Sequence, residues 1–153
     1  MATHFTMTAI GHVDGGRGPA EDDRWGGSRA AIILDGLPDA ALLGLDGFSH
    51  CEVIFVFDRL PEAEITIGAR RPRGNPDWPL VGILAQRGRN RPNRIGVSIC
   101  RVIAVAGSRL EVEGLDAIDG TPVLDIKPVL SGFLPRSVVR EPDWARAIMA
   151  DYW

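Results

Sequence analysis

The chain of 153 residues is 45% hydrophobic and 24% charged, which excludes a mainly disordered chain and fits one domain over residues 1–153. Its apolar runs are shorter than the ~20 residues that cross a bilayer. Thr3, His4 and Thr6 interrupt the region where a signal peptide would be apolar. The net charge of −3 by itself argues against a nucleic-acid partner. We therefore expect a soluble, cytoplasmic protein with no membrane partner.

Segments of β-branched and aromatic residues alternate with Gly, Pro and Asp, which is typical of many short strands. We expect strands at residues 5–13, 29–35, 51–59, 64–69, 80–85, 96–106, 109–114 and 122–127. Helical signal is limited to residues 38–43, and to residues 141–150 within a C-terminal tail or helix of residues 131–153. Strands without intervening helices favour an antiparallel arrangement, a barrel or a sandwich, over a parallel sheet. The expected fold is mainly β, an antiparallel barrel or sandwich with short helices.

The strand expected over residues 51–59 follows Ser49 and His50. A histidine at a strand start is more often a core or turn residue than a base, and no GxSxG motif accompanies Ser49. Cys51 and Cys100 both lie in apolar runs, so we expect buried, unreactive side chains, with a reactive thiol as the alternative. The three histidines have no metal-ligand spacing, and no metal site is predicted.

Positive charge is concentrated in residues 70–94, which hold seven arginines and one acid. This arginine stretch carries +6, and the remainder of the chain carries −9. Pro, Gly and Asn interrupt residues 70–79 and 87–93, so we expect two long loops. Pro92 makes the second loop rigid, which can aim Arg87 and Arg91 at an anion or at a partner carboxylate. A solvated loop is the alternative.

The next two strands differ in their pattern. Residues 97–105 are almost all apolar, which predicts a strand covered on both faces. Residues 110–113 alternate with period two, so one face should be wet. Gly107 between them suits a hairpin turn, and we expect the two strands to pair antiparallel.

The last strand follows a turn at Asp119-Gly120. Period two places Val123, Asp125 and Lys127 on one face of it, so the Asp and the only Lys of the chain can form an ion pair. By itself this segment favours a structural turn and strand over a catalytic site. The chain has neither a GxGxxG nor a GxxxxGK[ST] motif, so a nucleotide would bind through another architecture.

Several of these segments together resemble one family, the TsaA-like (TrmO) methyltransferases. The resemblance covers residues 8–130. It rests on Phe48-Ser49-His50 with the strand after it, Arg71-Pro72, Gly82-Ile83-Leu84-Ala85-Gln86-Arg87, Arg91-Pro92-Asn93-Arg94-Ile95-Gly96-Val97-Ser98 and Asp119-Gly120-Thr121-Pro122-Val123-Leu124-Asp125-Ile126-Lys127-Pro128. The resemblance implies a small antiparallel β-barrel that binds S-adenosylmethionine, works as a homodimer and N6-methylates threonylcarbamoyl-adenosine beside the tRNA anticodon.

The resemblance also implies site residues. The cofactor-binding positions fall on Phe57, Asp58, Arg87, Val97, Gly114, Leu115 and Asp116, and, where the match is broken, on Asp23, Arg24, Trp25 and Gly26. The expected substrate-binding residues are Arg71, Arg91, Asn93 and Lys127. Because a carbamoyl-substituted adenine nitrogen is a weak nucleophile, a general base is expected as well. The candidates are His50, Asp119 and Asp125.

The chain departs from the family pattern at several points. The usual RPNP reads Arg91-Pro92-Asn93-Arg94, the usual Thr-Arg-Ser reads Gln86-Arg87-Gly88, and the usual Pro-Tyr reads Pro128-Val129. Three hypotheses therefore stay open. The chain is a methyltransferase for an RNA base, a methyltransferase for a small or non-RNA substrate, or a non-catalytic cofactor-binding or interaction module whose arginine loops pair with acids across a dimer.

Overall fold

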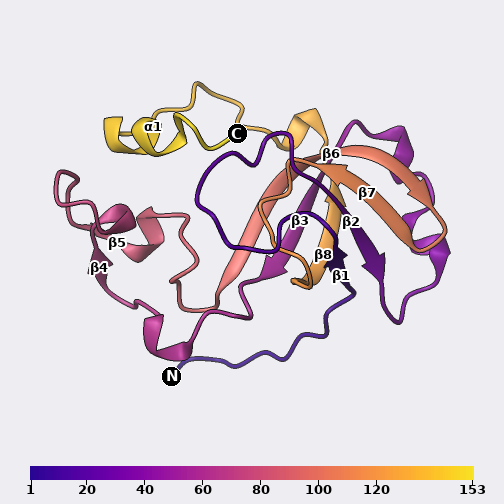
Figure 1. Ribbon diagram of the computed structural model, residues 1–153, viewed down its shortest axis with the longest axis horizontal. Coiled ribbons are helices and arrows are strands. Elements are labelled where there is room, and N and C mark those ends of the chain that lie inside the picture. The colour runs from indigo at the N-terminus through magenta and orange to yellow at the C-terminus, as the bar shows by residue number, and fades with distance from the viewer.

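The computed structural model describes residues 1–153, and its centre is a closed antiparallel barrel of six strands (Figure 1). In spatial order the strands are β1 (Gly11–Asp14), β2 (Arg29–Leu34), β7 (Arg109–Glu113), β6 (Ile95–Ala106), β3 (His50–Val56) and β8 (Pro122–Pro128). β8 pairs with both β3 and β1 and so closes the barrel. The expected antiparallel barrel is confirmed, and the sandwich alternative is wrong.

The other elements are short. β4 (Ala69–Arg70) and β5 (Val81–Gly82) form a separate two-stranded sheet, and α1 (Asp143–Met149) lies within the expected C-terminal helix. The remaining helical turns are 3₁₀ turns at Asp39–Leu42, Leu45–Gly47, Glu62–Glu64, Pro72–Gly74, Ile83–Ala85 and Ser131–Phe133. None of the helices has the length and apolar character that a membrane span requires.

Three expected strands are shorter than their sequences indicate. The strand expected at residues 5–13 begins only at Gly11, the one expected at 64–69 is reduced to Ala69 at the start of β4, and the one expected at 80–85 is reduced to Val81 and Gly82. Phe5, Ile67 and Leu84 are 85%, 86% and 79% exposed. Their β propensity has no packed neighbour to act on, and strand formation depends on such packing.

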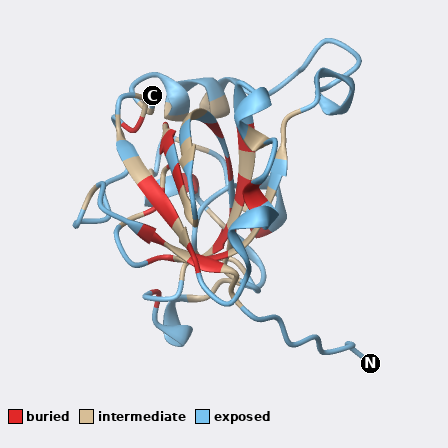
Figure 2. Ribbon diagram, turned by 90° about the vertical axis from the view of Figure 1, so that its right-hand side faces the viewer, coloured by how far each residue is buried: buried red, intermediate tan, exposed pale blue.

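The core fills the inside of the barrel, and Figure 2 shows buried residues concentrated in the strands. Cys51 and Cys100 are opposite each other on β3 and β6, and both are fully buried, as expected. Burial raises the pKa of Cys51 to about 11 and also raises the pKa of Cys100. Both thiols therefore stay protonated near neutral pH, which disfavours the reactive-thiol alternative.

The expectation that β6 is covered on both faces is wrong. Ser98 and Cys100 point into the barrel, whereas Val97 and Ile99 on the outer face are 39% and 45% exposed. An apolar run does not say what covers each face, and a barrel wall covers only its inner one. β7 alternates as expected, and Gly107 adopts a positive φ of 58° in the turn of the β6–β7 hairpin.

The expected face sharing in β8 is also wrong in one respect. The pairing of β8 with β3 shifts between Ile54 and Phe55, so Val123 lies opposite Phe55 while Ile126 lies opposite Val53. Val123 therefore faces the core, and Asp125 and Lys127 point outward. Their predicted ion pair forms, with 3.2 Å between Nζ and Oδ2, and both side chains are at least half exposed. The irregularity is an extra residue in one strand, which the period-two pattern cannot show.

Gly96 on β6 permits the close approach of an aromatic ring of the core. A Cβ at this position would lie 2.4 Å from Cε2 of Phe55, which is itself 1% exposed. We expect Gly96→Ala to lower the free energy of unfolding by about 1–3 kcal/mol, because the packed ring cannot move aside freely. Urea unfolding measures this loss. The matched control is Gly47→Ala, where a Cβ meets nothing within 4 Å. Equal stability of the two variants would contradict the packing argument.

Candidate functional site

Three segments that are distant in sequence meet at one place on the barrel. They are residues 23–26 in the loop between β1 and β2, residues 114–116 just after β7, and residues 151–153. Gly114 N–H donates to the Ser28 carbonyl at 2.9 Å, and the Gly26 carbonyl oxygen lies 3.8 Å from the Cβ position of Gly114. Figure 1 shows the C-terminal end returning to the barrel beside the β1–β2 loop.

Asp116 is the acidic centre of this cluster. Its Oδ1 accepts a hydrogen bond from the Ser98 hydroxyl on β6, and its Oδ2 accepts one from the Tyr152 hydroxyl. Desolvation by burial raises the pKa of the Asp116 carboxyl, and the Tyr152 hydrogen bond and the charge of Arg87 act in the opposite direction. A carboxylate here complements a cation, since its charge is little screened by water.

The loop at residues 23–26 is held by the C-terminal segment. The backbone N–H groups of Arg24 and Trp25 donate to the carbonyls of Asp151 and Tyr152, at 3.0 and 2.7 Å. A Cβ on Gly26 would lie 2.6 Å from the carbonyl carbon of Trp153, so only glycine permits this approach. The Trp25 indole is buried and donates to the Glu21 carbonyl at 3.1 Å. Its ring is therefore part of the packing below the site.

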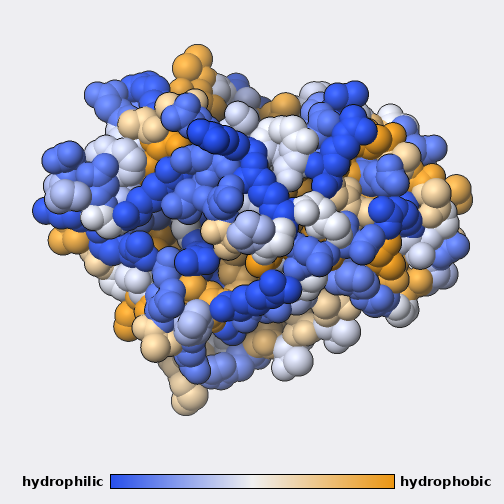
Figure 3. All heavy atoms as spheres, in the orientation of Figure 1, coloured by the Kyte–Doolittle hydropathy of each residue, from blue (hydrophilic) through white to orange (hydrophobic).

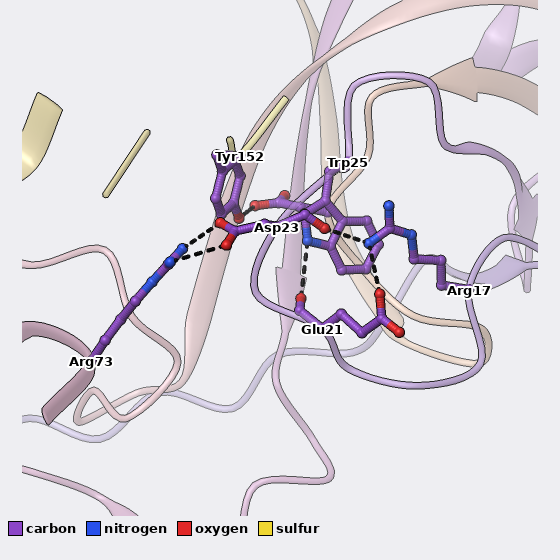
Figure 4. Close-up of polar contacts among 7 residues, drawn as sticks. Arg17, Glu21, Asp23, Trp25, Arg73 and Tyr152 are labelled. Carbon is purple, nitrogen blue, oxygen red and sulfur yellow. Dashed lines mark hydrogen bonds and ion pairs between the residues drawn. The ribbon is translucent and has the colours of Figure 1, made fainter. Parts of the chain in front are cut away.

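Arg73 connects the arginine stretch to this cluster. Its guanidinium pairs with the Asp23 carboxylate at 2.8 Å, and Figure 4 shows this pair beside the ring of Tyr152. The hydrogen bond to Asp23 raises the pKa of Arg73. The first arginine loop is thereby tied to the β1–β2 loop.

Arg87 lies near the Asp116 carboxylate and lowers its pKa, while its guanidinium donates to the Val97 carbonyl at 2.8 Å. Phe57 lies against Gly96, the residue of β6 before Val97, because its ring carbon Cζ is 3.0 Å from the Cβ position of Gly96. Two cofactor-binding candidates lie differently. Leu115 is 1% exposed and packs into the core, and Asp58 is exposed at the end of β3.

The three candidate bases are not brought together. His50 is exposed at the start of β3 and hydrogen-bonds Ser49 at 2.8 Å. The Asp119 carboxylate accepts the Gly15 N–H at 2.8 Å, in the turn that precedes β8. The His50 carbonyl accepts the N–H of Val129, which follows the last residue of β8. His50 and Asp119 therefore lie at opposite ends of that strand. Asp125 points outward from the barrel.

The candidate substrate-binding residues also lie apart. Arg71 and Arg91 donate to the carbonyls of Trp78 and Gln86, while Asn93 is exposed in the turn before β6. Lys127 lies on the outer face of the barrel, opposite Glu52 on β3. Figure 3 shows hydrophilic side chains gathered over the side of the molecule where β4, β5 and α1 lie.

The arginine stretch keeps most of its charge. Arg73 is its only arginine with a carboxylate partner, and Arg71, Arg87, Arg91 and Arg94 donate to backbone carbonyls. A bond to a carbonyl orients a guanidinium without neutralising it. These loops are therefore internally braced and still strongly positive, so the solvated-loop alternative describes them incompletely.

The cluster fits the cofactor that the sequence resemblance implies. A carboxylate at low solvent exposure suits a sulfonium or ammonium group, and Arg87 suits a carboxylate. Gly26 and Gly114 present backbone without side chains, and Phe57 supplies an apolar wall. No group of three His, Cys, Asp or Glu side chains could hold a metal ion. A surface hollow of about 370 Å³ lies elsewhere, between Trp78 and Trp144.

Sequence reasoning did not assign a role to three residues of this cluster. Ser98 ends the segment Arg91–Ser98 and Arg73 lies in the arginine stretch, so the sequence carries a signal for both. Tyr152 had none, because nothing in a short C-terminal sequence indicates that it folds back onto the barrel. Only the backbone pairing of residues 24–25 with residues 151–152 reveals it.

Comparison with known proteins supports one family. The family model described as the tRNA-methyltransferase O N-terminal domain matches residues 19–133. The chain is 36% identical over 96 residues to the tRNA (adenine(37)-N6)-methyltransferase of Mus musculus. These residues cover 63% of this chain and 22% of that protein. It is 40% identical over 96 residues to the protein of the same name from Escherichia coli (strain K12), covering 59% of this chain and 40% of that one.

The fold agrees with that family. A crystal structure of TrmO from Pseudomonas aeruginosa aligns with a TM-score of 0.74 and 26% identity, covering 93% of this chain and 62% of that chain. The chain spans about a fifth of the length of the first curated relatives that it matches. Since the family model covers most of the sequence and the barrel is the same, this chain belongs to the TsaA-like (TrmO) family.

Proposed function

We propose that this chain is an S-adenosylmethionine-dependent methyltransferase that methylates N6 of threonylcarbamoyl-adenosine beside the anticodon of tRNA. The observation that carries the proposal is the cluster around Asp116. The cofactor-binding positions that the family pattern implies lie on separate segments, and the fold brings Gly26, Gly114 and Asp116 together with Arg87 nearby. Matched relatives in mouse and Escherichia coli are named tRNA (adenine(37)-N6)-methyltransferases.

The residues of the cluster have distinct roles in this proposal. Asp116 places a negative charge next to a cationic cofactor, and Arg87 has further N–H groups for its carboxylate. Gly26 and Gly114 allow it to approach the backbone, and Phe57 covers an apolar part. When bound, S-adenosylmethionine supplies an electrophilic methyl group. The chain contributes by holding the acceptor nitrogen in line with that group, because orientation provides most of the rate enhancement in such a displacement.

Asp119 is the candidate base that we favour. It follows Asp116 by three residues, and its carboxylate is oriented by the Gly15 N–H. His50 and Asp125 are both on the barrel wall, and Asp125 is paired with Lys127. Asp119 would accept the proton that the substituted adenine N6 releases.

The arginine stretch would bind the phosphates of the anticodon. Six of its seven arginines lack an acidic partner, so their charge is available to an anion. Each phosphate contact releases counterions, so affinity for tRNA should fall steeply with salt. The acidic remainder of the chain favours a second candidate, a methyltransferase for a small or non-RNA substrate.

We further propose a homodimer that acts in the cytoplasm. The outer faces of β6 and β3 present Val97, Ile99 and Ile54 side by side, since Val97 lies opposite Ile54. Glu52 and Lys127 flank them with opposite charges. An apolar strip with a charged border is typical of an interface. A second copy would cover the outer face that the β6 sequence predicts to be buried.

The enzymatic proposal predicts transfer of a labelled methyl group to tRNA. We expect purified protein to methylate tRNA that carries threonylcarbamoyl-adenosine, and to leave tRNA without that modification unlabelled. Scintillation counting and nucleoside mass spectrometry measure the product. An active family member tested beside it is the control. Labelling of a metabolite pool with none of tRNA would select the second candidate instead.

Arg87 tests the cofactor site. We expect Arg87→Ala to weaken S-adenosylmethionine binding by about 10- to 100-fold, which corresponds to ~1.5–3 kcal/mol for a lost charge-assisted hydrogen bond. Isothermal calorimetry measures the affinity. Arg89→Ala is the matched control, because Arg89 is exposed in the same loop. Intact cofactor affinity with a lost dimer in Arg87→Ala would favour a structural role for this arginine.

Ile99 tests the proposed dimer. We expect Ile99→Asp to convert the dimer to a monomer, because a charge in an apolar interface loses its water without a partner. Light scattering after size-exclusion chromatography measures the mass. Val138→Asp adds the same charge at a side chain that is 94% exposed, and should leave the mass unchanged. A monomeric parent protein would refute the dimer.

A further inference from the structure

We propose that Tyr152 is a positioning residue of the cofactor site, which fixes the Asp116 carboxylate toward the bound cofactor. The inference rests on the proposed cofactor function, and it adds a side chain that neither the family pattern nor the sequence indicates. It follows from the hydrogen bond that the Tyr152 hydroxyl donates to Oδ2 of Asp116.

The position of Tyr152 is determined by the backbone around it. Its carbonyl accepts the Trp25 N–H at 2.7 Å, and the preceding carbonyl, that of Asp151, accepts the Arg24 N–H at 3.0 Å. On its other side the ring of Trp153 packs edge-on at 4.9 Å between centroids, and Trp153 rests on Gly26. Two backbone bonds and an edge-on aromatic neighbour therefore hold the Tyr152 side chain in place.

The two oxygens of Asp116 are held by different parts of the fold. Ser98 donates to Oδ1 from the barrel wall, and Tyr152 donates to Oδ2 from the C-terminal segment. A carboxylate with both oxygens bonded cannot rotate about its terminal torsion, so its remaining lone pairs point in a defined direction. Such orientation before binding is what a cofactor site requires. Without Tyr152, the Asp116 side chain would be held from one side only.

Several titratable and charged groups surround the Tyr152–Asp116 pair. Arg87 from the second arginine loop faces both groups, Arg73 lies near Tyr152, and the neutral thiol of Cys100 faces Asp116 from inside the barrel. Burial raises the pKa of Tyr152, so its hydroxyl remains a donor at neutral pH. The bond from Tyr152 lowers the pKa of Asp116 against the effect of burial.

Removal of the Tyr152 hydroxyl should change the pKa of Asp116, and the direction follows from these shifts. Without the Tyr152 bond, the pKa of Asp116 rises further, because burial then acts with less opposition. The ionised form of Asp116 is the one that complements a cation, so cofactor affinity is lost as the pH falls through this pKa. The loss should therefore begin at a higher pH in the variant than in the parent.

The test compares Tyr152→Phe with the parent protein by calorimetry with S-adenosylmethionine, from about pH 5 to about pH 8. We expect affinity about tenfold weaker near neutral pH, with the pH of half-maximal affinity moved upward. Thr121→Val is the matched control, because it removes a hydroxyl that donates to the Ile118 carbonyl at 2.7 Å. This control should lower Tm without moving the pH dependence.

A second measurement needs no cofactor. Titration of the Asp116 carboxyl carbon by NMR should show a higher pKa in Tyr152→Phe than in the parent. If the parent fails to bind S-adenosylmethionine, the proposed function fails and the inference with it. If the parent binds and the variant binds with the same affinity and pH dependence, the inference alone is overturned. Tighter binding by the variant would also overturn it, since Tyr152 would then occupy the cofactor's space.

Discussion

Closure of the barrel is the constraint on which the rest of this structure depends. A strand at the edge of an open sheet leaves a row of N–H and C=O groups unpaired, and β8 removes both edges by pairing with β3 on one side and β1 on the other. The closed wall encloses the core, and its side chains are packed closely enough that Gly96 is needed beside Phe55. Loops are thereby excluded from the interior and gather at the ends of the strands.

The candidate site is a consequence of that arrangement. Residues 114–116 leave β7 and continue beside β6, which brings Asp116 to the Ser98 hydroxyl. Tyr152 also bonds Asp116 there, and residues 151–152 are held by the β1–β2 loop. A carboxylate placed there is partly removed from water yet remains hydrogen-bonded, so its charge complements a cation without a large cost of isolation.

The arginine stretch both braces its loops and keeps them positively charged. Its guanidinium groups brace the loops by donating to carbonyls, as Arg91 does to Gln86 and Arg94 to Leu60. Because carbonyls do not cancel charge, the loops that result are ordered and positive together. Arg73 is the exception, and its pairing with Asp23 joins the stretch to the site. An anionic substrate held by these loops would thus lie next to the proposed cofactor.

Local sequence was sufficient to predict an antiparallel β fold, the β6–β7 hairpin and the buried cysteines, since period-two patterns and turn residues report on neighbours in the chain. The choice of a barrel over a sandwich came from the family resemblance. It overestimated the strands near residues 5 and 67, where β-prone side chains have nothing to pack against. It also missed the irregularity opposite Ile54 that turns Asp125 away from the core.

The candidate site was less predictable from sequence than the fold. The family resemblance indicated Arg87, which lies in a quoted motif, and Gly114 and Asp116, which lie in a turn between two such motifs. Their assembly with Gly26, Arg73 and Tyr152 was decided only by tertiary structure. These contacts join residues far apart in the chain, from 36 positions for Asp116 and Tyr152 to more than a hundred for Trp25 and Tyr152, and no local pattern encodes a pairing over such distances.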